Sequence, residues 1–209
     1  FQGPRAFSVV FRSGKPGLIY MVLVASTAPA FALAVTNTSV ANVVFILAAT
    51  PIFAAIYSRI FLGEPIERRM VLTLIVVVIG LGVITIGSSE SEIASWKGDL
   101  WAVYIAAAFA AALTAVRKIK DVSMVPAVPF AYIGAALVLL LFTSPFEAFA
   151  ANWPLYLGHG VMIGAASCLL TLGPRYITSA EVSLLVLLES VLAPILVWWV
   201  LGEDPGPLA

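Results

Sequence analysis

Seven long apolar runs follow one another along the chain and constrain its fold more than any other feature. Because about 20 apolar residues in a helix cross the hydrocarbon core of a bilayer, each run is long enough for one crossing. The runs are apolar on nearly all sides, whereas a helix of a soluble bundle carries a polar stripe. The sequence therefore predicts an all-α integral membrane protein, a helical bundle of about seven transmembrane helices, at residues 17–36, 40–62, 70–87, 100–116, 124–143, 155–173 and 182–201.

Composition agrees with a membrane protein and excludes several other classes. The chain is 62% apolar and 11% charged, whereas a soluble domain is about a quarter charged. Its formal net charge is zero, so no overall positive field favours nucleic acid, and we expect no such partner. Cys168 is the single cysteine. Without further Cys or clustered His residues, the sequence predicts no disulfide, no metal site and no cofactor.

The basic residues lie in alternate loops and predict an orientation. Lys and Arg are retained on the cytoplasmic side of short loops. If the first full helix starts inside, ten of the 11 basic residues fall inside and Lys97 alone falls outside. The ten inner residues are Arg5, Arg12, Lys15, Arg59, Arg68, Arg69, Arg117, Lys118, Lys120 and Arg175.

Two segments of the chain resemble each other. Each starts near a Thr-Ser pair, at 38–39 and 178–179, and each ends in Leu-Gly-Glu, at 62–64 and 201–203, with the two triplets 139 positions apart. Four other runs separate the segments, so the repeated unit has five helices and its copies cross the membrane in opposite directions. Inverted repeats are typical of transporters, whose substrate site lies near the midplane between the two halves.

The repeated pattern resembles a known family. A Thr-Ser pair, an apolar stretch interrupted by Glu or Pro, Leu-Gly-Glu, and then a basic start to a Gly-rich helix are similar to the EamA repeat of the drug/metabolite transporter superfamily. Residues 38–86 resemble the last two helices of the first repeat, and residues 177–205 resemble the penultimate helix of the second. The resemblance implies a 5+5 inverted-repeat fold of ten helices with both termini in the cytoplasm.

This resemblance also predicts how the chain is divided. We expect residues 1–87 to be the C-terminal part of the first EamA repeat, 88–99 an outer linker, and 100–209 a second repeat truncated before its last helix. The chain starts with Phe1 rather than Met. We therefore expect a piece of a longer protein that holds the third to ninth helices.

Glu189 is the strongest candidate for a functional side chain. Of the Asp, Glu, Lys and Arg residues, it alone lies near the middle of an apolar run, where a charge costs about 2.5–3.5 kcal/mol on insertion scales. It is either a proton- or cation-binding site that contacts substrate, or a protonated carboxyl bonded to a neighbouring helix. Aligned from Leu-Gly-Glu, Glu189 and Ser190 match Thr50 and Pro51, so each copy keeps one half of the family's Glu-Pro.

Other polar and proline residues complete the candidate site. Asn42, Thr50, Tyr57 and Ser190 are further candidates for substrate or proton binding. Prolines inside a helix remove a backbone hydrogen bond, and in transporters such breaks turn carbonyls toward a cavity. Hinge candidates, with simple packing kinks as the alternative, are Pro29, Pro51 and Pro194.

These features favour a secondary transporter of small organic metabolites or drugs that works by alternating access, with export as the expected direction. The chain has no nucleotide-binding Gly-x-x-x-x-Gly-Lys-Ser/Thr loop, so a gradient of substrate or protons supplies the energy. A seven-helix receptor and a membrane-embedded enzyme are the alternatives, although the enzyme lacks a grouped catalytic set. Expected partners are a small-molecule substrate, protons and the lipid bilayer of a plasma membrane, such as a bacterial inner membrane. Faces of small residues predict internal packing, with a homodimer as the alternative.

Overall fold

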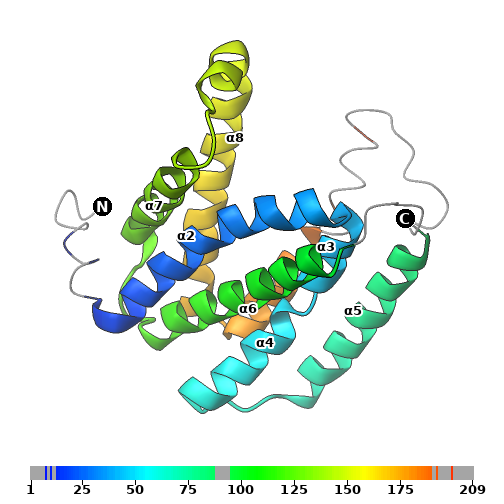
Figure 1. Cartoon of the computed structure of the whole chain (residues 1–209). Helices are drawn as coiled ribbons and strands as arrows, with labels where there is room; N and C mark the ends of the chain where they lie inside the picture. Colours follow the sequence, from blue (N-terminus) through cyan, green and yellow to red (C-terminus); the bar gives the residue numbers. More distant parts are fainter. Residues whose placement is uncertain are drawn as a thin grey trace.

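The computed structural model describes residues 8, 10, 13–87, 95–189, 192 and 199, and the elements within them are all helical (Figure 1). In chain order these elements are α2 (Gly14–Asn37), α3 (Val40–Leu47), α4 (Thr50–Tyr57), the π-helix η2 (Ser58–Leu62), α5 (Arg68–Gly87), α6 (Trp96–Lys118), the short η3 (Val125–Ala127), α7 (Val128–Leu140), α8 (Phe146–Leu172), the short η4 (Gly173–Arg175) and α9 (Ser179–Val186).

Four stretches of the described residues are long and apolar enough to cross a membrane. They are Gly14–Asn37, Asn42–Leu62, Trp96–Lys118 and Ala148–Arg175. The second of them joins most of α3 with α4 and η2. Three further predicted crossings correspond to other elements. The run at 70–87 lies in the 20-residue α5, and the run at 124–143 contains η3 and the 13-residue α7. The run at 182–201 begins in α9, and most of its residues after 189 lie outside the described part. The all-helical membrane architecture is therefore confirmed, whereas the count of seven crossings stays a prediction.

Helix α6 lies at the centre of the bundle. It runs beside α2 and also packs against α3, α4 and α9, and Figure 1 shows it between α2 and α4. Its buried face is built from alanines: Ala102 packs with Ala30 and Ala34 of α2, and Ala110 packs with Ala54 of α4. Small side chains let helix backbones approach closely. The alanines of α6 therefore let α2 and α4 pack closely against it.

Helix α6 approaches the end of α2 closely at Gly98, in the first turn of α6. A Cβ atom there would lie 2.7 Å from the Cβ of Thr38 and 2.8 Å from the backbone carbonyl carbon of Asn37. Beside it, the Nδ2 of Asn42 donates a hydrogen bond to the Oδ1 of Asp99 at 2.8 Å. Glycine is therefore required for this close packing.

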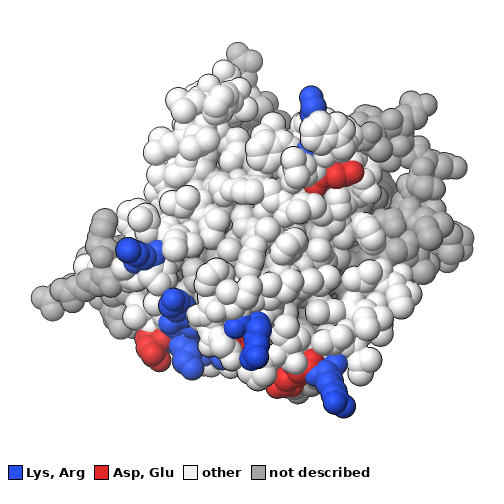
Figure 2. All heavy atoms as spheres, turned by 60° about the horizontal axis from the view of Figure 1, so that its bottom comes forward, with Lys and Arg blue, Asp and Glu red and all other residues white. Residues whose placement is uncertain are grey.

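The charged residues distinguish the two ends of the bundle. Figure 2 shows basic side chains gathered along one edge of the molecule and a lone basic group at the opposite edge. We call the end with Lys15, Arg59 and Lys118 the inner end, and the end with Lys97 the outer end. Arg5 and Arg12 lie outside the described residues. The described basic residues are therefore separated between the two ends as the sequence predicts, whereas the end that faces the cytoplasm stays a prediction.

Helices α3 and α9 have the same local structure. Each has eight residues, and each is capped by a hydroxyl: Ser39 accepts from the backbone N–H of Asn42, and Thr178 accepts from that of Glu181. Both helices end in a turn, at residues 48–49 and 187–188. Ser39 and Thr178 are 139 positions apart, the spacing of the two Leu-Gly-Glu triplets. In the register set by Leu-Gly-Glu, Thr178 therefore corresponds to Ser39 rather than to Thr38.

Candidate functional site

The stretch of α3 and α4 is interrupted near its middle. Residues 48–49 form a turn, and Thr50 and Pro51 start α4. The hydroxyl of Thr50 donates to the carbonyl of Leu47, while Pro51 has no N–H and so cannot donate to the preceding turn. Both side chains are buried. The N–H groups of Ala48 and Ala49 bond to carbonyls of the preceding turn, so the interruption is confined to these residues.

The same interruption occurs after α9. A turn at residues 187–188 follows Val186, and Glu189 is the first helical residue beyond it. Its side chain is exposed. Thr50 and Glu189 thus hold the same position after their breaks, as the sequence alignment predicts. Ser190 and Pro194 lie outside the described residues.

The other predicted site residues are not brought together. Asn42 lies at the outer end, where it also donates to the hydroxyl of Thr38. Tyr57 lies at the inner end of α4, and its ring centroid is 6.2 Å from those of Phe53 and Phe61. At about 1.5 Å per residue, the fifteen positions from Asn42 to Tyr57 span about 22 Å. These residues and Thr50 mark three levels of one crossing rather than a single pocket.

The described hinge candidates, Pro29 and Pro51, lie in different local structures. Pro51 is at a break, whereas α2 continues through Pro29 from Gly14 to Asn37. A kink that we did not predict occurs in α8, where Asn152 has φ −133° and ψ 30°, two residues before Pro154. The sequence Asn-Trp-Pro was its signal, since residues before a proline are displaced from helical geometry. The predicted run began after this proline, whereas α8 begins at Phe146.

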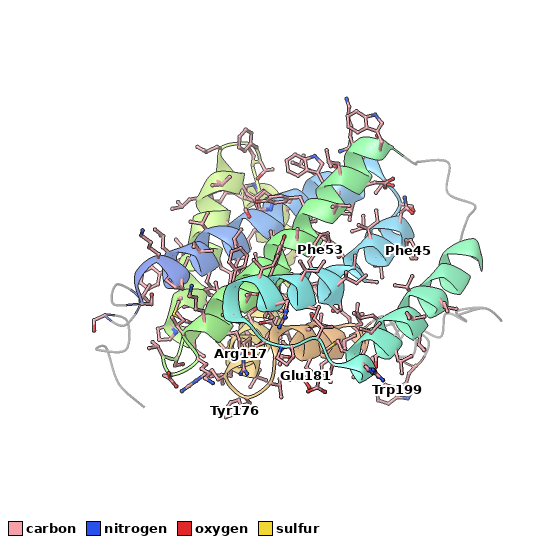
Figure 3. The ribbon with its side chains drawn as sticks, turned by 90° about the horizontal axis from the view of Figure 1, so that it is seen from below. Phe45, Phe53, Arg117, Tyr176, Glu181 and Trp199 are labelled. Atoms are coloured by element: carbon pink, nitrogen blue, oxygen red, sulfur yellow. The ribbon has the colours of Figure 1, made fainter. Side chains whose placement is uncertain are left out.

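A polar cluster at the inner end was also missed by sequence reasoning. The Nε of Arg117 lies 2.8 Å from the Oε1 of Glu64, and its Nη1 donates to the carbonyl of Pro174 at 3.0 Å. The two side chains are only 15% and 22% exposed. Arg175 in turn donates to the carbonyl of Lys120 at 2.8 Å. Figure 3 shows this part of the molecule, with Arg117 and Glu181 near its centre.

Two hollows lie near this cluster. A small cavity of about 40 Å³ separates the loop after η2 from the start of α9, and its polar lining comes from Ser58, Glu64, Glu67, Thr178 and Glu181. A larger, mainly apolar groove of about 570 Å³ is lined by Tyr57 and Phe61 of the N-terminal half and by Ala111 and Thr114 of α6, with Lys15 and Lys118 among its residues. Tyr57 is thus the one predicted candidate that lines either hollow.

Comparison with known proteins identifies the family. The model of the EamA-like transporter family matches two segments, residues 6–86 and 96–209. Searches of curated proteins and of solved structures gave no match. The family is one of membrane transporters and not of enzymes, which confirms the resemblance of the repeated pattern and the expectation that the chain is not an enzyme. The chain is therefore an integral membrane protein that belongs to the EamA-like transporter family.

Proposed function

We propose that this protein is a secondary transporter that exports small organic metabolites across a plasma membrane by alternating access. Family membership implies membrane transport of metabolites or drugs. The observation that carries the more specific proposal is the pair of helix breaks at residues 48–49 and 187–188. We take residues 1–87 and 100–209 as two inverted repeats, joined by a linker at 88–99.

The geometry of the two broken helices supports a substrate site between them. Helix α3 starts at the outer end and α9 starts at the inner end, so the two run toward the middle from opposite sides. Each break then offers the carbonyl end of one half-helix and the N–H end of the next. Half-helix ends of this kind bind charged groups of substrates and coupling ions in transporters. Thr50 and Glu189 occupy the first position beyond each break.

The packing of α4 against α9 at the inner end supports a state that is closed on the inner side. Ala54 and Ala55 of α4 share a buried cluster with Ala180 of α9. Beside this contact, Glu64 and Arg117 form their ion pair. Alternating access requires such contacts to form on one side and separate on the other, with the substrate site between them.

The charges near the middle favour amino acids, their relatives or amphipathic metabolites as substrates. Among the described residues, Lys and Arg lie near the ends of the helices, so a doubly anionic substrate lacks a cationic partner at the midplane. Glu189 instead provides an acidic group, which suits a substrate with an amine or coupling to protons. This proposal makes Glu189 the side chain with the greatest effect on flux.

The proposal is tested with the full-length protein in proteoliposomes. A panel of radiolabelled amino acids and amphipathic amines is screened for flux, and Glu189→Gln is compared with the parent at several pH values. We expect lower flux and an altered pH dependence in the variant. Asp121→Asn, at an exposed position, is the matched control. Unchanged flux and pH dependence in Glu189→Gln would remove Glu189 from the mechanism, and binding without flux would support a receptor instead.

A further inference from the structure

The larger groove at the inner end combines an apolar surface with two lysines. Helix α6 contributes small side chains to its lining, at Ala111, Thr114 and Ala115. Ile19 of α2 and Phe61 of η2 also line the groove, and they are 48% and 62% exposed. Its volume of about 570 Å³ is typical of a ligand site, which has about 300–1,000 Å³. The groove is therefore large enough for a ligand and opens to the surface of the bundle.

The two lysines of the groove, Lys15 and Lys118, have no anionic partner in the part of the chain that the structure describes. The ion pair found there joins Arg117 to Glu64 and involves neither lysine. The described residues that line the groove include no Asp or Glu. Two positive charges in one lining repel each other unless an anion lies between them. The groove therefore favours a ligand with a negative charge.

The charged and apolar parts of the groove lie at different depths along the helices. Lys15 is in the first turn of α2, and Lys118 is the last residue of α6. Ala111 lies seven positions before Lys118, which is about 10 Å along the helix. A lysine near a helix end extends its ammonium group to the headgroup region while its methylene chain stays on apolar surface. The groove is therefore positive at the membrane surface and apolar about 10 Å deeper.

An anionic phospholipid has the same arrangement of charge and hydrocarbon. Its phosphate lies in the headgroup region and its acyl chains lie in the bilayer core, and basic pockets between transmembrane helices bind headgroups of this kind. A zwitterionic phospholipid fits less well, because its ammonium group meets the same two lysines. A small soluble anion compensates the lysines but leaves the apolar surface uncovered. Charge and depth together therefore favour an anionic lipid.

We propose that this groove binds one anionic phospholipid, with its phosphate between Lys15 and Lys118. One acyl chain lies along Ile19, Phe61 and Ala111. Because the lining comes from α2, α4, η2 and α6, the bound lipid stabilises the packing of these helices at the inner end. The site depends neither on the substrate nor on the direction of transport, so its failure would leave the proposed function intact.

The test measures thermal unfolding of the purified full-length protein in detergent micelles that contain phosphatidylglycerol or phosphatidylcholine at equal mole fractions. Ligand at ten times its dissociation constant raises the melting temperature of a chain this size by about 3–6 °C. We expect that increase with phosphatidylglycerol and a smaller one with phosphatidylcholine. In Lys15→Gln/Lys118→Gln, the fraction of phosphatidylglycerol for half the effect should rise about thirtyfold, because each lysine near the membrane surface contributes about fivefold.

Lys97→Gln/Lys120→Gln is the matched control, since it removes the same charge from two exposed positions that do not line the groove. It should keep the response of the parent to phosphatidylglycerol. Ala111→Phe fills the apolar part of the groove and keeps both of its lysines. This variant should respond less to both lipids, because the acyl chain loses its contact surface.

Three outcomes would overturn the proposal. Equal melting temperatures of the parent in the two lipids would do so even if the groove variants failed to fold, and would mean that something other than an anionic lipid fills the groove. An equal loss of the response in Lys15→Gln/Lys118→Gln and in Lys97→Gln/Lys120→Gln would show a general effect of charge. The same increase with glycerol 3-phosphate in place of lipid would show that a soluble anion is sufficient.

Discussion

The Nε of Arg117 and the Oε1 of Glu64 are 2.8 Å apart and join the end of α6 to the loop that follows η2. The two residues are 53 positions apart in the chain and belong to different halves of it. The guanidinium also holds the carbonyl of Pro174. One side chain therefore connects three segments at the inner end.

Replacing Arg117 by Gln should destabilise the protein by about 1.5–3 kcal/mol, because hydrogen bonds to a charged group are lost and Glu64 stays partly buried without its partner. Unfolding in detergent with increasing denaturant measures the change. The double variant Arg117→Gln/Glu64→Gln should recover part of the loss. Arg59→Gln is the control, since Arg59 is exposed at the same end. Equal stability of Arg117→Gln and Arg59→Gln would contradict this role of the pair.

Gly98→Ala should be destabilising by about 1–3 kcal/mol, because the added methyl group clashes with Thr38 and the backbone of Asn37. The same change at Gly158, in α8, meets no atom within 4 Å and should be neutral or stabilising by up to about 1 kcal/mol. The difference between the melting temperatures of the two variants is the measurement. A Gly98→Ala protein as stable as Gly158→Ala would show that α6 and α2 do not approach closely here.

Tyr20→Phe should cost about 1 kcal/mol. The hydroxyl of Tyr20 lies 2.7 Å from the Oγ1 of Thr171, and this buried contact links α2 to α8. The loss of stability is small because Thr171 keeps its own hydrogen bond to the carbonyl of Ser167 at 2.7 Å. Tyr156→Phe, at an exposed position of α8, should change the melting temperature less. If both variants melt at the same temperature, the contact between Tyr20 and Thr171 does not contribute to stability.

The features that sequence could predict are those with a local physical cause. Runs of apolar residues predict helices because the bilayer requires internal hydrogen bonds, and the alternating basic loops agree with where Lys15, Arg59 and Lys118 lie. The break before Pro51 follows from the missing N–H of proline. Glu189 is a candidate because a charge inside an apolar run is costly, and its role stays a prediction.

The features that could not be predicted from the sequence depend on the packing of distant segments. Arg117 and Glu64 each lie at the end of a predicted helix, and nothing local distinguishes them from solvated charges. In runs that are apolar on all sides, periodicity cannot assign a face, so Asn42 and Tyr57 were grouped with Thr50 although they lie at opposite ends of one crossing. The buried state of Ser58 likewise comes from its neighbours in α9 and the loop after η2.

Pro51→Ala should reduce transport while leaving the protein folded. An alanine at this position restores an N–H that can donate to Leu47, so the turn at residues 48–49 can convert to continuous helix. If the break holds part of the substrate site, flux in proteoliposomes should fall by about tenfold, equivalent to about 1.4 kcal/mol in the barrier, with the melting temperature raised or unchanged. Pro129→Ala is the control, because Pro129 lies in the exposed first turn of α7, and it should transport at the rate of the parent. Parental flux in Pro51→Ala would mean that the break is a packing feature only.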